Sequence, residues 1–179
     1  MNEQKVSSRY ARALLEIARK EGITEKIYSD LKYIRHTIEQ SRELKTLTFS
    51  PVIQFWRKKK IYEELLTGKV QTLTMNFIIL LTDKRRESLL PDICYQYEVQ
   101  YDELNNILPI EIESAIELSD DIKNKITKKI EKNTNKKVIS DFRINKSMKG
   151  GLLVKIRDWV YDASLKNQLE ILFKKLSAD

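Results

Sequence analysis

Residues that commonly build metal, redox and phosphate sites are scarce in this sequence. Its 179 residues include one histidine, His36, and one cysteine, Cys94, too few for a His/Cys zinc site, a disulfide framework or a Cys-x-x-Cys redox pair. With only four glycines, the chain has neither a Gly-x-x-x-x-Gly-Lys phosphate loop nor a dinucleotide fingerprint. Adjacent acidic residues such as Glu63-Glu64 point in different directions on a helix and make no convergent acid–base pair. We therefore expect no metal, no cofactor and no enzymatic activity.

Long apolar runs are missing as well. The longest run, Phe77 to Leu81, contains five residues, whereas a membrane-spanning helix needs about 20. The first residues lack the apolar core of a signal peptide and are too acidic for an organellar transit peptide. These features predict a soluble, cytosolic chain without a membrane-inserted segment.

The composition favours long helices around a real core. Hydrophobic residues make up 41% of the chain and charged residues 33%, a balance that excludes a wholly disordered protein. Only three prolines and four glycines are present, so few tight turns are expected. Apolar residues at helical spacing, such as Ile27, Leu31, Ile34 and Ile38, predict helices before residue 105. The six predicted helices begin at Ser7 or Ser8, Thr24, Ser41, Ser50-Pro51, Val70 and Ser88, and the last ends near Leu104.

Near Asn105 the apolar spacing changes from helical to alternating. Alternation predicts strands over residues 107–114, 138–144 and 152–156, and Arg157-Asp158 is typical of a turn into Trp159, Val160 and Tyr161. Ser119 and Ser164 each precede a helical pattern. We expect the last helix to turn one stripe inward, formed by Leu165, Leu169, Leu172 or Phe173, and Leu176. The predicted fold class is α+β, mostly α, with an N-terminal six-helix bundle over residues 1–105 and a small β-α-β-β-α domain over residues 106–179.

The formal net charge of +7 raises the alternative of a basic helical adaptor that binds nucleic acid. The densest basic run, Arg57 to Lys60, is typical of a solvated helix face, with a contact to phosphates or to an acidic protein as the alternative. Lys84 to Arg86 follow the fifth helix, where cations favour the C-terminal end of the helix dipole. Tyr97 and Tyr101 share helical spacing with Ile93, which favours core packing over base stacking.

Two predicted helices carry more apolar surface than one-sided burial requires. In the first, Ala11 and Leu15 widen the apolar stripe beyond the roughly 100° of an ordinary surface helix. The fifth is apolar nearly all round between Leu73 and Leu81. Either these helices are central in their bundle, or they form a groove that accepts an amphipathic helix of a partner.

Ordered segments along the whole chain carry a family resemblance. They are Ser8-Arg9-Tyr10-Ala11-Arg12-Ala13-Leu14, Ser50-Pro51, Asn76 to Leu90, Gly150 to Ile156, and Val160 to Leu169. In this order they resemble the delta subunit of F-type ATP synthase, the counterpart of the mitochondrial oligomycin-sensitivity-conferring protein. Where that family usually has Asp-Gly-Ser, this chain has Asp162-Ala163-Ser164.

The resemblance implies a non-catalytic stator subunit of the rotary, proton-translocating ATP synthase. Residues 1–105 would grip the N-terminal helix of an alpha subunit in the catalytic head, and residues 106–179 would bind the b subunits of the peripheral stalk. The head would then be held still while the rotor turns, at the cytoplasmic face of the bacterial inner membrane, with no direct membrane insertion and no nucleic acid. The groove residues that the resemblance implies are Tyr10, Ala13, Leu14, Ile17, Asn76, Phe77, Ile79 and Leu80.

Overall fold

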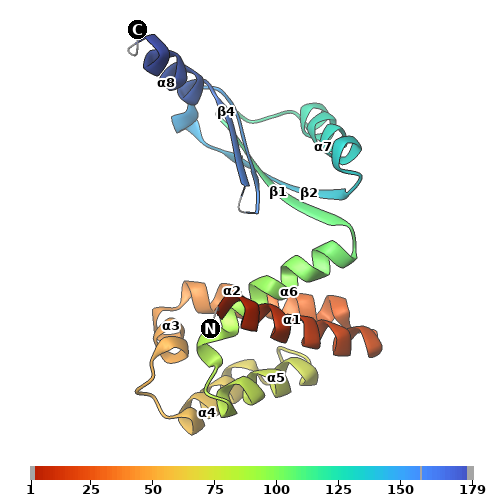
Figure 1. Cartoon of the computed structure of the whole chain (residues 1–179), viewed down its shortest axis with the longest axis vertical. Helices are drawn as coiled ribbons and strands as arrows, with labels where there is room; N and C mark the ends of the chain where they lie inside the picture. The colour runs from red at the N-terminus through yellow and green to blue at the C-terminus, as the bar shows by residue number, and fades with distance from the viewer. Residues whose placement is uncertain (1–2, 158, 177–179) are drawn as a thin grey trace. The chain divides into compact units, whose positions relative to one another are not determined.

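The computed structural model describes residues 3–157 and 159–176. The chain forms two compact units, one up to residue 101 and one from residue 102 onward, close to the predicted boundary. Before the sheet, the described residues form six α-helices (Figure 1). They are α1 (Glu3–Lys20), α2 (Thr24–Gln40), α3 (Arg42–Phe49), α4 (Phe55–Leu66), α5 (Thr72–Asp83) and α6 (Leu90–Leu104). None of the described helices combines the length and apolar composition needed to span a bilayer.

The helical unit packs around the apolar stripe of α2. Ile27, Leu31, Ile34 and Ile38 are all buried, so the helical spacing predicted for this segment is confirmed. Asp30 interrupts the same buried surface, and its Oδ2 accepts hydrogen bonds from the Gln71 backbone N–H and from Thr74 Oγ1, each at 2.7 Å. The Asp30 carboxylate thus satisfies one free backbone amide at the start of α5, that of Gln71, together with the Thr74 hydroxyl.

The predicted start of the fourth helix at Ser50-Pro51 is wrong. Ser50 follows α3, and its Oγ accepts a hydrogen bond from the Val52 backbone N–H at 3.3 Å, but residues 51–53 form a bend and α4 begins at Phe55. Val52 is 86% exposed. A turn of helix here would gain no buried contact, and packing supplies most of the stability of helices in proteins.

The other predicted helix starts had mixed outcomes. Ser41 caps α3, because its Oγ accepts from the Leu44 backbone N–H at 3.2 Å, and Ser164 caps the last helix through the Asn167 N–H, also at 3.2 Å. Ser7 does not cap α1, which begins at Glu3 and buries Ser7. Thr24 is the first residue of α2 and not its cap.

The second unit is built on a four-stranded mixed sheet in the order β2-β1-β3-β4. Its elements are β1 (Ile107–Ser114), α7 (Asp120–Thr134), β2 (Lys137–Ile144), β3 (Gly151–Ile156), β4 (Trp159–Ser164) and α8 (Leu165–Leu176). β1 pairs in parallel with β2 and antiparallel with β3, which places Ile112 opposite both Phe142 and Val154. The predicted class, α+β and mostly α, is confirmed.

The segment predicted after the turn, Trp159 to Tyr161, belongs to a fourth strand, which the predicted β-α-β-β-α order does not count. Trp159–Ser164 pairs antiparallel with β3, so a fourth strand stands between the third and α8. Arg157 has a positive φ of 51°, as expected for a turn residue, whereas Asp158 lies outside the described residues. Gly151 has a φ of +83°, and a Cβ there would lie 2.3 Å from the Ala163 carbonyl oxygen, so this close approach of β3 to β4 requires glycine.

Among the described residues, the core of this unit is small and includes no side chain of α8. Leu108, Ile110, Ile112 and Val138 are buried, and Ile126 and Ile130 of α7 pack against them. The predicted inward stripe of α8 is wrong for its described side chains, because Leu165, Leu169 and Phe173 are exposed. The side chains of Leu172 and Leu176 lie outside the described set. Helical spacing correctly identified an apolar stripe on α8. However, α8 follows β4, which is an edge strand of the sheet, and the described side chains of the stripe remain exposed.

Candidate partner-binding faces

Helices α1 and α5 meet through an aromatic contact. The rings of Tyr10 and Phe77 pack edge to face, with centroids 6.2 Å apart and planes at 67°. Arg86, which follows α5, donates a hydrogen bond from Nη1 to the Tyr10 hydroxyl at 2.8 Å, and its guanidinium lies 5.8 Å from the centre of the same ring. These contacts of Tyr10, Phe77 and Arg86 hold α1 against α5 and the residues that follow it.

The eight predicted groove residues separate into surface and core. Ala13, Ile17 and Asn76 are exposed, Leu80 is 46% exposed, and Tyr10 and Ile79 are half-buried. We call these six residues the α1–α5 face. The other two lie beneath it, with Phe77 buried and Leu14 only 1% exposed.

A shallow cavity of about 320 Å³ lies along α1 beside this face. It is lined by Val6, Arg9, Tyr10, Ala13 and Arg86. Arg9 and Arg86 were missed as components of the face, since the position of Arg86 after α5 was explained by the helix dipole alone. The cavity shows that the α1 side of the face is hollow and that cations border it.

The basic run on α4 is only in part a solvated face. Lys60 is exposed, as predicted, and its Nζ lies 3.9 Å from Glu64 Oε1. Lys58 is 2% exposed, and its Nζ donates to Glu87 Oε1 at 2.5 Å. The expectation of a wholly solvated run is therefore wrong for Lys58, because a carboxylate distant in sequence pairs with it inside the protein.

The aromatic residues of α6 pack within the helical unit. Tyr97 is fully buried and donates its hydroxyl to the Thr24 carbonyl oxygen at 3.2 Å. Tyr101 stacks on Tyr28 with ring centroids 4.5 Å apart. The prediction of packing over base stacking is confirmed for these two tyrosines.

Burial keeps the Tyr62 hydroxyl and the Cys94 thiol of this core neutral. It raises the pKa of the Tyr62 hydroxyl to about 12, and it raises the pKa of the Cys94 thiol far above its usual range. A thiol held protonated in this way is a poor nucleophile. Among the described residues, no group of three or more His, Cys, Asp or Glu side chains could hold a metal ion.

The second unit exposes apolar side chains of its own. Trp159, which is 81% exposed, and Tyr161 are two residues apart on β4. They therefore point to the same side of the sheet. Leu165, Leu169 and Phe173, the last 71% exposed, follow one another every fourth residue along α8. We call these two sets the C-terminal apolar rows. Contiguous exposed apolar surface of this kind marks an interaction site.

Nearly the whole chain is similar to proteins of one known family. The model of the family described as ATP synthase delta (OSCP) subunit matches residues 6–176. The ATP synthase subunit delta of Chlorobaculum tepidum is 36% identical over 178 residues, which cover 99% of this chain and 98% of the relative. That of Carboxydothermus hydrogenoformans is 36% identical, with coverage of 94% and 95%.

A solved structure agrees in fold. One chain in the cryo-EM structure of the Toxoplasma gondii mitochondrial ATP synthase hexamer matches with a TM-score of 0.73 at 21% identity, covering 97% of this chain and 98% of that one. At this identity the likeness concerns the fold alone.

Proposed function

Because the chain belongs to the ATP synthase delta (OSCP) subunit family, we propose that it is a non-catalytic stator subunit of a rotary, proton-translocating ATP synthase. Its helical unit binds the alpha/beta catalytic head, its second unit binds the peripheral stalk, and the head is thereby kept from turning with the rotor. The complex lies at the cytoplasmic face of the bacterial inner membrane. One observation carries this proposal: each of the two compact units exposes apolar side chains that the chain itself does not cover.

The head contact is the α1–α5 face, and its ligand is the amphipathic N-terminal helix of an alpha subunit. Ala13 allows close approach of a helix backbone, while Ile17 and Leu80 supply apolar contact on either side. Leu14 and Phe77 support the face from the core. A helix seated here would bury about 800 Å² on each partner, the usual size of a specific interface.

The stalk contact is the C-terminal apolar rows, and its ligands are the b subunits. Leu165, Leu169 and Phe173 form a stripe of the kind that packs against another amphipathic helix. The exposed Trp159 and Tyr161 belong to the residue types enriched at interfaces.

Calorimetric titration of the chain with a peptide of the alpha N-terminal helix tests the head contact. We expect one-to-one binding that changes little between low and high salt, because the contact is mainly apolar. Leu80→Asp should weaken it by about thirtyfold or more, as for a central interface residue, since it places an unpaired charge in the contact.

Leu65→Asp is the matched control, because Leu65 is also a partly exposed leucine but lies on α4. It should leave the affinity unchanged. Equal losses in both variants, or unchanged affinity in a folded Leu80→Asp protein, would contradict the assignment of the α1–α5 face. Oligonucleotide binding that falls steeply with salt would instead support the nucleic-acid alternative.

A further inference from the structure

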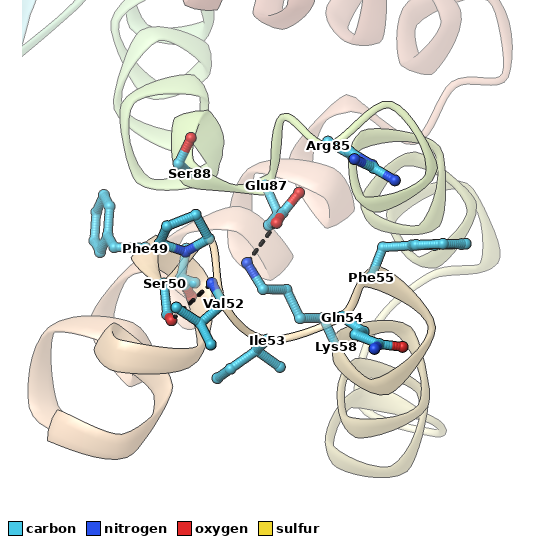
Figure 2. A pocket seen from close by; sticks show the side chains of 12 residues that line it. Phe49, Ser50, Val52, Ile53, Gln54, Phe55, Lys58, Arg85, Glu87 and Ser88 are labelled. Carbon is cyan, nitrogen blue, oxygen red and sulfur yellow. Dashed lines mark hydrogen bonds and ion pairs between the residues drawn. The ribbon is translucent and has the colours of Figure 1, made fainter.

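A second cavity in the helical unit lies away from the cavity beside α1. It has a volume of about 480 Å³ and is enclosed by the connection from α3 to α4 and by the segment after α5 (Figure 2). Its lining residues are Thr48, Phe49, Ser50, Pro51, Val52, Ile53, Gln54, Phe55, Lys58, Arg85, Glu87 and Ser88. The volume is within the range of pockets that hold small ligands or inserted side chains.

The base of this pocket is the buried ion pair of Lys58 and Glu87. In Figure 2 the Lys58 side chain reaches from α4 to the Glu87 carboxylate. The second carboxylate oxygen, Oε2, is buried and has no hydrogen-bond partner among the described residues. A buried acceptor without a donor is unfavourable, so a bound molecule that brings an N–H group to the pocket would stabilise it.

The walls of the pocket are apolar and unusually exposed. Phe49, Val52 and Phe55 border the cavity, and all three are exposed. Phe49 ends α3, Phe55 begins α4, and Val52 lies in the connection between them, where residues 51–53 form no helix. Because side chains of this size are normally covered when they cluster, the walls are suited to hold an apolar side chain of a partner.

Positive charge borders the same opening. Glu87 is the one carboxylate in the pocket lining, and Lys58 pairs with it, which leaves the charge of Arg85 unbalanced there. Arg85 has a positive φ of 56°, and its guanidinium lies 5.9 Å from the centre of the Phe55 ring. Lys59 and Lys60 of α4 pair with Asp83 and Glu64, so the unbalanced charge at the opening is that of Arg85. This charge is complementary to an acidic ligand.

We propose that this pocket is a second docking site, which binds an acidic segment of a partner protein through one large apolar anchor. The anchor inserts between Phe49, Val52 and Phe55, and a neighbouring carboxylate pairs with Arg85. A concave pocket favours an inserted side chain over a flat lipid surface. The site is separate from the α1–α5 face: Arg86 contacts Tyr10, whereas its neighbour Arg85 contacts Phe55.

The test is an NMR titration of the isotope-labelled full chain with an acetylated, amidated Glu-Glu-Phe-Glu-Glu peptide. We expect saturable binding with amide shifts concentrated at residues 48–55 and 85–88. Replacing the peptide phenylalanine with alanine should abolish these shifts. Arg85→Glu should weaken binding by about tenfold or more, since it reverses the charge at the contact, and Val52→Asp should weaken it without loss of folding because Val52 is a surface residue.

Lys60→Glu is the control, because it makes the same change of charge on α4 at a residue outside the pocket. Unchanged affinity in this variant supports the pocket, and an equal loss would reveal general charge attraction and overturn it. Shifts centred on α1 and α5, or displacement of the peptide by phosphatidylglycerol vesicles, would also overturn it. Leu80→Asp should leave peptide binding intact, so this proposal and the stator proposal fail independently.

Discussion

At the scale of single residues, the ion pair of Lys58 and Glu87 both stabilises the helical unit and lines the proposed pocket. Both side chains are almost fully buried, and removing one partner from such a pair leaves an uncompensated charge. Lys58→Met should therefore lower the free energy of unfolding of the helical unit by about 3–5 kcal/mol, measured by urea denaturation with Trp56 fluorescence.

The double variant Lys58→Met, Glu87→Gln distinguishes the cost of an unpaired buried charge from the cost of altered packing. It should recover most of the stability, because no buried charge remains. Lys60→Met, at an exposed lysine of the same helix, should change little. A Lys58→Met protein as stable as the parent would show that the carboxylate is not buried in solution.

A second residue-scale prediction concerns two glycines that share a left-handed backbone. At Gly151 an added Cβ meets the Ala163 carbonyl oxygen, whereas at Gly68, with a φ of +76°, nothing lies within 4 Å. Gly68→Ala should cost about 1 kcal/mol for the conformation alone. Gly151→Ala should cost about 3–4 kcal/mol, because a clash with the backbone adds to that strain. Denaturation followed at Trp159 for Gly151 and at Trp56 for Gly68 compares them, and similar losses would contradict the close approach of β3 and β4.

At the scale of elements, the start of α8 is predicted to depend on pH. Hydrogen bonds from Ser164, by its side chain and its backbone N–H, lower the pKa of Asp162, and the Ser164 hydroxyl in turn caps α8. A carboxylate with a lowered pKa in the folded state stabilises that state above its unfolded pKa, and this contribution is lost as the pH falls through the folded value.

Amide hydrogen exchange measures this effect directly. Protection at the first turn of α8 should decrease as the pH falls below the usual aspartate range, after correction for the intrinsic exchange rate. Asp162→Asn removes the titrating group and should abolish the pH dependence. If protection in the parent protein is also independent of pH, as expected for Asp162→Asn, then Asp162 does not stabilise the start of α8.

Some helices could be predicted from the sequence alone, whereas the bounds and burial of others could not. The spacing of Ile27, Leu31, Ile34 and Ile38 predicted α2 because burial on one side is a local property of a helix. The start of α4 could not be found in the same way, because the Ser50 hydroxyl only accepts a local bond from the Val52 N–H, and no buried contact continues this turn into a helix. Likewise, the stripe of α8 was visible in the sequence, but whether the chain covers it depends on the edge position of β4.

The candidate faces were predictable to a similar extent. Ala13, Ile17 and Leu80 are on the surface as a partner contact requires, whereas Leu14 and Phe77 belong to the core. Periodicity alone cannot make this distinction on helices that are apolar on several sides. The pocket beneath Arg85 was not predicted, because Lys58 and Glu87 are 29 residues apart in sequence.

At the scale of the whole molecule, the proposed stator role requires the chain to hold two partners through separate surfaces. The α1–α5 face belongs to the unit before residue 102, and the C-terminal apolar rows belong to the unit after it. Each contact should therefore be removable without the other. Leu169→Asp alters an exposed residue of α8, so it should leave the fold intact while it abolishes binding of the cytoplasmic segment of the b subunits.

Sedimentation of the catalytic head with the chain and this b segment tests the linkage as a whole. The parent chain should carry the b segment down with the head. Leu169→Asp should sediment with the head but leave the b segment in solution, and Leu80→Asp should bind the b segment but remain with it in the supernatant. In the proposed stator role the head is held only while both contacts are intact, so loss of either contact should release the head. One substitution that removed both contacts would instead indicate a single continuous binding surface and contradict the division of labour between the two units.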